Sequence, residues 1–182
     1  MTFIILDRDG VINYDSSEYI KSPAEWLPIP GSLPAIAKLN RAGFRVIIAT
    51  NQSGIARGFY DIAMLNAIHE KLINELKVCG GHIEEIFFCP HHPQDHCHCR
   101  KPNPGLLYQI QAKYSVELAK TFFIGDSLVD VQAARAAGCQ PLLVRTGKGL
   151  EVLQKHSELL IPNFADLAEA VDYVLYGVKN GN

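Results

Sequence analysis

The chain has 182 residues, of which 48% are hydrophobic and 20% are charged, and its net charge is −2 at pH 7. This composition is typical of a globular protein with one sizeable core, so we expect a single domain over residues 1–182. The charge excludes the basic footprint of a nucleic-acid partner, and no apolar run is long enough to span a membrane. Residues 1–7 lack the features of a signal peptide, so we expect a cytoplasmic protein.

Apolar runs that are typical of buried parallel strands alternate with helical patterns along the chain. The first strand is predicted at residues 3–6, directly at the N-terminus. A helix then starts at Pro30-Gly31-Ser32 and ends before Gly43. The second strand follows at residues 44–49. A long helix begins near residue 61, has one apolar face, and is ended by two glycines at 80–81.

The same alternation continues through the second half of the chain. The third strand is predicted at residues 86–89, and Pro104 starts the next helix. The fourth strand, at residues 121–125, is followed by an alanine-rich helix, and the fifth strand lies at residues 141–144. A last helix carries apolar residues at helical spacing, Leu167, Val171, Val174 and Leu175. The pattern predicts a doubly wound α/β fold, with a parallel, Rossmann-like sheet and helices on both faces.

Residues 10–30 form the one long stretch without clear periodicity. A loop of that length in a compact domain usually has a function, and we interpret it as a flap over a ligand site. The spaces between the other elements are short, so no large cap domain is expected.

Four polar clusters follow the predicted strands. They are Asp7-Arg8-Asp9-Gly10, Thr50-Asn51-Gln52-Ser53, Arg100-Lys101-Pro102 and Gly125-Asp126-Ser127. The carboxyl ends of parallel strands share one edge of the sheet, where ligands bind in α/β proteins. We therefore expect the four clusters to meet in one crevice.

The chemistry of the four clusters is complementary. Of Asp7 and Asp9, one carboxylate can attack phosphorus while the other acts as acid and base. Asp126 adds a further carboxylate and makes an oxygen-rich site suited to Mg²⁺. Thr50 and Lys101 can bind phosphate oxygens. Any one cluster alone is as readily a turn or a surface charge, but together they predict phosphoryl transfer.

The segment between the third strand and Lys101 is rich in thiols and imidazoles. Cys89, Cys97 and Cys99 with one histidine would complete a tetrahedral zinc site. We choose His91, although composition alone leaves His92, His96 and His98 open. The alternatives are a solvated polar loop with reduced thiols, or a redox pair at Cys97 and Cys99.

We expect this zinc to be structural, because a full ligand shell leaves no position for a reacting water. A rigid zinc loop would place Arg100 and Lys101 at the crevice. The remaining cysteines, Cys79 and Cys139, are interpreted as ordinary buried or partly buried thiols.

The cluster Asp7-Arg8-Asp9-Gly10 resembles the D-x-D-G signature of the haloacid dehalogenase (HAD) superfamily of phosphatases. Thr50, Lys101 and residues 125–130 match the other three motifs of that superfamily in order. The resemblance implies Asp7 as the nucleophile and Asp9 as general acid and base, with Thr50 and Lys101 completing the catalytic set. It implies Mg²⁺ held by the Asp7 carboxylate, the Asp9 main-chain carbonyl and Asp126.

Two further positions bear on this resemblance. Asp130 would be a supporting acid that orients Lys101, although it could also be only a surface acid of the helix. Ser127 stands where some members have lysine, which puts any cationic contact from that position in doubt.

The pattern C-x-H…C-x-C followed by R-K-P resembles the branch that holds histidinol-phosphate and heptose-bisphosphate phosphatases. Residues 21–32, 50–58 and 89–93 are similar to the heptose-bisphosphate phosphatases in particular. This likeness implies removal of the C7 phosphate of D-glycero-D-manno-heptose 1,7-bisphosphate, on the route to nucleotide-activated heptose for lipopolysaccharide. The substrate contacts that it implies are Asp15, Ser16, Ser17, Glu18, Asn51, Gln52, Ser53 and Arg100.

Alternatives remain open from the sequence. The flap residues could form a plain polar loop, and Arg57 is expected to be a surface residue. Histidinol phosphate is the nearest alternative substrate. A non-catalytic zinc-stabilised phosphate-binding module is the other alternative, although every expected catalytic side chain is present. The expected partner is a small phosphosugar, bound by a monomer, and the sequence does not choose the anomer at C1.

Overall fold

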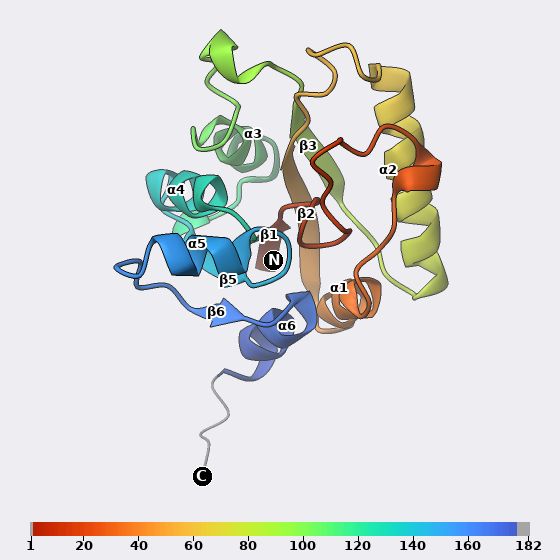
Figure 1. Ribbon diagram of the computed structural model, residues 1–182. Coiled ribbons are helices and arrows are strands. Elements are labelled where there is room, and N and C mark those ends of the chain that lie inside the picture. The colour runs from red at the N-terminus through yellow and green to blue at the C-terminus, as the bar shows by residue number, and fades with distance from the viewer. Residues whose placement is uncertain (1, 178–182) are drawn as a thin grey trace.

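The computed structural model describes residues 2–177 and is built around a six-stranded parallel sheet (Figure 1). The strands lie in the order β3-β2-β1-β4-β5-β6. They are β1 (Thr2–Leu6), β2 (Phe44–Asn51), β3 (Glu85–Cys89), β4 (Phe122–Gly125), β5 (Gln140–Val144) and β6 (Asn163–Phe164). The predicted fold class is therefore confirmed. Residues 1 and 178–182 of the predicted domain lie outside the described part of the chain.

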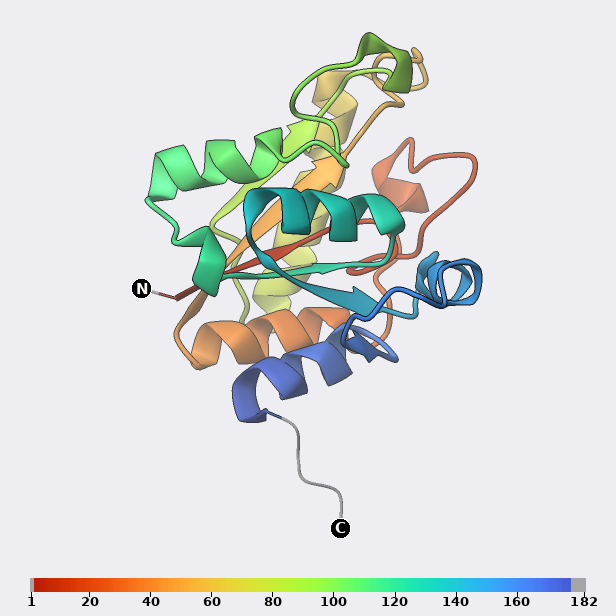
Figure 2. The ribbon, with the colours of Figure 1, turned by 90° about the vertical axis from the view of Figure 1, so that its left-hand side faces the viewer.

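Helices cover both faces of the sheet. They are α1 (Ser32–Arg41), α2 (Ile62–Val78), α3 (Gly105–Tyr114), α4 (Leu128–Ala137), α5 (Gly149–Lys155) and α6 (Leu167–Tyr176). Figure 2 shows α3 and α4, in green and teal, on one side of the sheet and α1 and α6, in orange and dark blue, on the other. Among the described residues, no helix combines the length and the apolar character that a membrane crossing requires.

Strand β1 shows why the sheet is buried on both faces. Ile4 and Leu6 belong to a core cluster that includes side chains of α1, α2 and α6. Phe3 and Ile5 point the opposite way, into a second cluster that includes side chains of α3 and α4. Successive strand residues face opposite sides, so a strand covered on both faces must be apolar throughout. The unbroken apolar run of the sequence has this cause.

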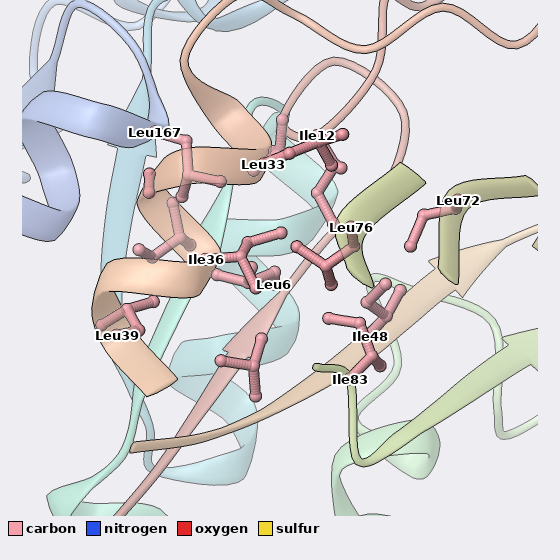
Figure 3. Close-up of a cluster of buried hydrophobic side chains, with 14 of the residues drawn as sticks. Leu6, Ile12, Leu33, Ile36, Leu39, Ile48, Leu72, Leu76, Ile83 and Leu167 are labelled. Carbon is pink, nitrogen blue, oxygen red and sulfur yellow. The ribbon is translucent and has the colours of Figure 1, made fainter. Parts of the chain in front are cut away.

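The larger core cluster holds the flap segment to the sheet. Figure 3 shows Ile12, from this segment, next to Leu33 in the cluster that also includes Leu6 and Ile36. Trp26, near the other end of the segment, is fully buried as well. A short 3-10 helix at Pro23–Glu25 lies beside α2 (Figure 1). The flap is therefore shorter than expected. Apolar burial anchors both ends of the segment 10–30, and residues 14–19 are exposed or partly exposed.

The structure differs from the sequence-based prediction in several other elements. Strand β2 continues to Asn51, so Thr50 lies within the strand. Helix α5 and strand β6 were not predicted, because seven and two residues are too few to show a period. Two short 3-10 helices, Pro93–Asp95 and Leu118–Lys120, were missed for the same reason.

Burial in this core predicts a large loss of stability on truncation. Ile36 on α1 is fully buried, so Ile36→Ala should lower the free energy of unfolding by about 2–5 kcal/mol, through lost burial and a cavity. Val78→Ala is the control, because Val78 at the end of α2 is 90% exposed, and its effect should stay within about 0.5 kcal/mol. Urea unfolding at fixed metal concentration measures both values. Equal effects of the two substitutions would contradict this account of the core.

Candidate active site

The four polar clusters meet at the carboxyl ends of the central strands. They line one cavity of about 520 Å³. Of the residues expected at a site, those that line it are Asp7, Asp9, Asp15, Ser16, Ser17, Thr50, Asn51, Gln52, Ser53, Arg100, Lys101 and Asp126. Glu18 is exposed and does not line this cavity. The cavity sits beside β1, where the chain order of the strands reverses, and this is where α/β sheets bind ligands.

A buried lysine lies at the centre of the site. The Lys101 ammonium is 2.9 Å from Asp7 Oδ2 and 2.6 Å from Asp130 Oδ1, and it donates to the Ala49 carbonyl at 2.9 Å. Its side chain is 1% exposed. The two carboxylates raise the pKa of Lys101 against the effect of burial, so the side chain is a fixed cation. Asp130, which the sequence left open as a surface acid, is buried here and holds this cation in place.

Negative charge exceeds positive charge around Lys101. The carboxylates of Asp7, Asp126 and Asp130 lie within 4.8 Å of one another. Burial and the charges of Asp130 and Asp126 raise the pKa of Asp7 well above its ordinary value, although Lys101 opposes the shift. Burial and Asp130 raise the pKa of Asp126 to about 7. Three close carboxylates with one ammonium form the kind of site that a divalent cation stabilises.

The Asp126 carboxylate is held between two glycines. A Cβ at Gly10 or at Gly147 would lie 2.2 Å or 2.1 Å from Asp126 Oδ2, so neither position tolerates a side chain without movement. Both glycines have positive φ. The Lys148 backbone N–H donates to the same oxygen at 2.8 Å. Asp126 is thus fixed by the loop after β5, which the sequence analysis did not connect with the site.

The Asp9 side chain points to different partners from Asp7. Its carboxylate accepts hydrogen bonds from the side chains of Arg8, Asn13 and Gln52. Burial pushes the pKa of Asp9 upward, but the Arg8 charge and these hydrogen bonds outweigh burial and lower it. Asp9 is therefore a carboxylate with a full set of donors, on the cavity wall.

The residues at the end of β2 are mostly engaged within the protein. Asn51 donates to the Lys101 carbonyl at 3.0 Å and accepts from the Lys101 N–H at 3.1 Å, which fastens the Lys101 loop to the strand. The Gln52 amide donates to Asp9 and to the Thr50 hydroxyl. Asn51 and Gln52 were expected to contact substrate. Their side chains instead form hydrogen bonds that position the Lys101 loop, Asp9 and Thr50.

Arg100 has a free capacity for a ligand. Its Nη1 is buried and has no hydrogen-bond partner among residues 2–177. Arg100 lines the main cavity and also an adjoining hollow beside the cysteine loop. An unpaired buried guanidinium nitrogen is costly, and a polar ligand would satisfy it.

Several lining residues were missed by the sequence analysis. They are Tyr19, Ile20, Leu128, Val129, Lys148, Glu151, Val152, Lys155 and His156. The Lys148 ammonium is 2.9 Å from Asp15 Oδ2, which links the exposed part of the flap to the loop after β5. The same rule that singled out the other clusters, polar residues directly after a strand, could have found Lys148. Arg57 is exposed, as expected, and its guanidinium lies over the Tyr19 ring, 5.9 Å from the ring centre.

The cysteine loop gathers four ligand groups. Cys89, His91, Cys97 and Cys99 each offer one atom within 4.8 Å of the others. His91 Nδ1 is 3.4 Å from Cys89 Sγ and 3.2 Å from Cys99 Sγ. The other candidate histidines, His92, His96 and His98, are outside this group. His92 caps the short 3-10 helix of the loop instead.

Comparisons with known proteins agree with this geometry. A HAD-hydrolase-like family model matches residues 98–170. D-glycero-beta-D-manno-heptose-1,7-bisphosphate 7-phosphatases from Pseudomonas aeruginosa and Bordetella bronchiseptica are 51% and 55% identical to the chain. The first alignment covers 93% of this chain and 97% of the relative, and the second covers 84% and 86%. The chain belongs to this family of phosphatases. It is accordingly a phosphatase of the HAD superfamily, as the sequence motifs predicted.

A solved structure extends the likeness to three dimensions. It is the D,D-heptose 1,7-bisphosphate phosphatase of B. bronchiseptica, complexed with magnesium and phosphate. It matches 96% of this chain and 98% of its own chain, at 50% identity and a TM-score of 0.94. A second phosphatase of this kind, from Burkholderia thailandensis, matches 97% of this chain at 38% identity and a TM-score of 0.75.

The four ligand groups of the cysteine loop predict a bound metal that supports folding. Elemental analysis of the purified protein should find about one zinc per chain. Cys97→Ser should lower the zinc content and reduce the melting temperature by at least about 5 °C, because metal binding is coupled to folding.

The control for this prediction is Cys79→Ser. Cys79 is a free thiol outside the group, so its replacement should leave the zinc content unchanged. Full zinc content and unchanged melting in Cys97→Ser would show that the group does not hold a metal.

Proposed function

We propose that this phosphatase removes the 7-phosphate of D-glycero-β-D-manno-heptose 1,7-bisphosphate and leaves the heptose 1-phosphate. The observation that carries the proposal is the convergence of Asp7, Lys101 and Asp126 in one cavity, in a chain that aligns with such phosphatases over nearly its whole length. The β anomer and the 7-position come from the names of the relatives.

The proposed reaction begins with attack by Asp7. Both carboxylate oxygens are oriented, because Oδ1 accepts from the Arg8 N–H at 2.7 Å and Oδ2 faces Lys101. A bond forms between an Asp7 oxygen and phosphorus, and the bond between phosphorus and the C7 oxygen breaks. Asp9 enters this step protonated, although its donors lower its pKa in the free enzyme, and it gives the leaving oxygen the proton that a sugar alkoxide needs.

The second half of the reaction restores the nucleophile. Asp9 takes a proton from a water molecule, and the water oxygen bonds to phosphorus. The bond between phosphorus and the Asp7 oxygen then breaks, which releases phosphate and the free carboxylate. Lys101 and the Thr50 hydroxyl would bind the phosphoryl oxygens throughout, so their contribution is positioning and charge.

Two metals fit the donor groups of this chain. Mg²⁺ would be held by the carboxylates of Asp7 and Asp126 and by the Asp9 main-chain carbonyl. The excess of carboxylates over cations supports it, as does the magnesium in the B. bronchiseptica structure. When bound, it would neutralise charge on the carboxylates and the phosphoryl oxygens. Zn²⁺ would be held by Cys89, His91, Cys97 and Cys99, and would fix the loop that precedes Arg100 and Lys101.

The setting of the reaction is also part of the proposal. A heptose phosphatase of this kind would serve the synthesis of ADP- or GDP-activated heptose for lipopolysaccharide. None of the five cysteines is in a disulfide in the described part of the chain, which favours the reducing cytoplasm. All the lining residues named above belong to this chain, and we propose a single-domain enzyme over residues 1–182 that acts as a monomer.

The nucleophile can be identified by trapping. Wild-type enzyme quenched during turnover should carry a phosphoryl group on the peptide that contains Asp7. Asp7→Asn should carry none and should lose turnover by several orders of magnitude, roughly 10³-fold or more. Asp15→Asn is the control, because Asp15 lies in the same cavity but pairs with Lys148, and its loss should not exceed ~10-fold. Normal turnover in Asp7→Asn would overturn the assignment.

The substrate can be tested with two esters side by side. We expect kcat/KM for heptose 1,7-bisphosphate to exceed that for histidinol phosphate by at least ~100-fold, equivalent to roughly 2.7 kcal/mol of transition-state binding. Arg100→Ala should shrink this preference, because its unpaired nitrogen would no longer meet the sugar or the distal phosphate. Lys101→Ala should depress both substrates together. A reversed preference in the wild type would point to histidinol phosphate as the substrate.

A further inference from the structure

The Asp9 carboxylate lies in a cradle of donors that leaves it one orientation. Oδ1 accepts from Arg8 Nε at 3.1 Å, from Arg8 Nη2 at 2.9 Å and from Asn13 Nδ2 at 2.8 Å. Oδ2 accepts from Arg8 Nη2 at 2.9 Å and from Gln52 Nε2 at 2.8 Å. These five contacts exceed the roughly four lone-pair sites of a carboxylate, so the Asp9 group has little freedom to rotate.

The Arg8 side of the cradle is fixed by a residue of α2. Arg8 is 1% exposed, and its Nη1 lies 3.2 Å from His69 Nε2. Arginine can only donate, so His69 must present an unprotonated Nε2 and carry its proton on Nδ1. Burial and the Arg8 charge lower the pKa of His69 to about 3, which keeps the ring neutral and able to accept. The His69 ring in turn packs edge-on against Phe88, with ring centres 6.1 Å apart.

The Gln52 side of the cradle is fixed by Tyr60. The Tyr60 hydroxyl donates to Gln52 Oε1 at 2.7 Å. Burial raises the pKa of Tyr60 to about 12, so the hydroxyl keeps the proton that it donates. With its oxygen held by Tyr60, the Gln52 amide must turn its NH₂ toward Asp9 and Thr50. Gly54 makes room for the Tyr60 ring, because a Cβ there would lie 2.3 Å from Tyr60 Cε1.

We propose that His69 and Tyr60 are positioning residues, which act through Arg8 and Gln52 to hold the Asp9 carboxylate in one orientation on the cavity wall. Neither residue lines the cavity, so neither is offered as a catalytic residue. The proposal rests on the proposed function, in which Asp9 is the general acid and base. Arg8, Gln52 and Asn13 all donate to the carboxylate, and each positioning residue fixes one of the first two, so loss of either would loosen that part of the cradle.

The prediction concerns leaving groups rather than overall activity. An alkyl ester needs a proton on its leaving oxygen, whereas p-nitrophenolate leaves without one. The parameter kcat/KM reports the steps up to departure of the leaving group. A displaced Asp9 side chain should therefore lower kcat/KM more for the alkyl ester than for the aryl ester. A merely structural defect would lower both esters in the same proportion.

The experiment compares heptose 1,7-bisphosphate with p-nitrophenyl phosphate in Tyr60→Phe and His69→Leu. In each variant, kcat/KM should fall ~10-fold for the sugar ester and no more than ~2-fold for the aryl ester. His69→Gln supplies an oxygen that can accept from Arg8, and should recover the sugar ester to within ~3-fold of wild type. If histidinol phosphate proves to be the ester that is turned over, it replaces the sugar ester in the same comparison.

The matched control is Tyr114→Phe. The Tyr114 hydroxyl also donates a 2.7 Å hydrogen bond, but to Glu85 at the start of β3, whereas Asp9 follows the carboxyl end of β1. Its loss should leave the ratio of the two esters unchanged. Melting temperatures of all variants, measured with metal present, show whether each one is folded under the assay conditions.

Asp9→Asn separates the two levels of the proposal. It should lose far more on the alkyl ester than on the aryl ester. If it does so while Tyr60→Phe and His69→Leu lower both esters equally, or neither, the positioning role is wrong and the proposed function stands. If Asp9→Asn itself lowers both esters equally, the acid role fails, and the positioning role fails with it.

Discussion

The balance of charge around Lys101 is the constraint on which the site depends. One buried ammonium faces Asp7 and Asp130, with Asp126 close by, in a part of the protein that water scarcely reaches. Removing one partner of such a buried pair commonly costs about 3–5 kcal/mol, because the other charge is left uncompensated. The site therefore needs Lys101 in one place. Asn51 secures its backbone, and the cysteine loop with its four ligand groups directly precedes it in the chain.

This constraint explains why two metal-ligand groups of opposite chemical character occur in one small fold. The thiols and imidazole of the cysteine loop lie outside the cavity, where a metal would stiffen the chain before Arg100. The carboxylates at the sheet edge lie within the cavity, where a cation would offset charge. A metal in the first group would stabilise the fold, and a metal in the second would take part in catalysis. Because the two groups lie apart, each can consist of the ligand type that its metal would prefer.

The cavity walls come from segments that owe their positions to the core. The flap is anchored at its two ends by Ile12 and Trp26, which are fully buried. Its exposed middle part can therefore be polar while both ends stay fixed to the core. Lys148 reaches that tip through Asp15 and fixes Asp126 through its backbone. Behind the cavity, Arg8, His69, Gln52 and Tyr60 form a buried polar network. Such networks are stable only when fully paired, and pairing gives them one geometry.

The sequence by itself determined the parallel sheet, its first five strands and the chemistry at the ends of those strands, because strand burial leaves local apolar runs in the sequence. It also predicted that Cys89, Cys97 and Cys99 belong to one metal-ligand group, because three cysteines in so short a loop are typical of metal binding. Only the tertiary structure decided that Asp130 faces Lys101, that Gln52 serves Asp9, and that Lys148 belongs to the cavity. Helix α5 and strand β6 were likewise too short to leave a period. These outcomes depend on contacts between residues that are far apart in the chain. The Thr146 hydroxyl, for example, donates to the Gly10 carbonyl 136 residues away, and no local pattern encodes such a contact.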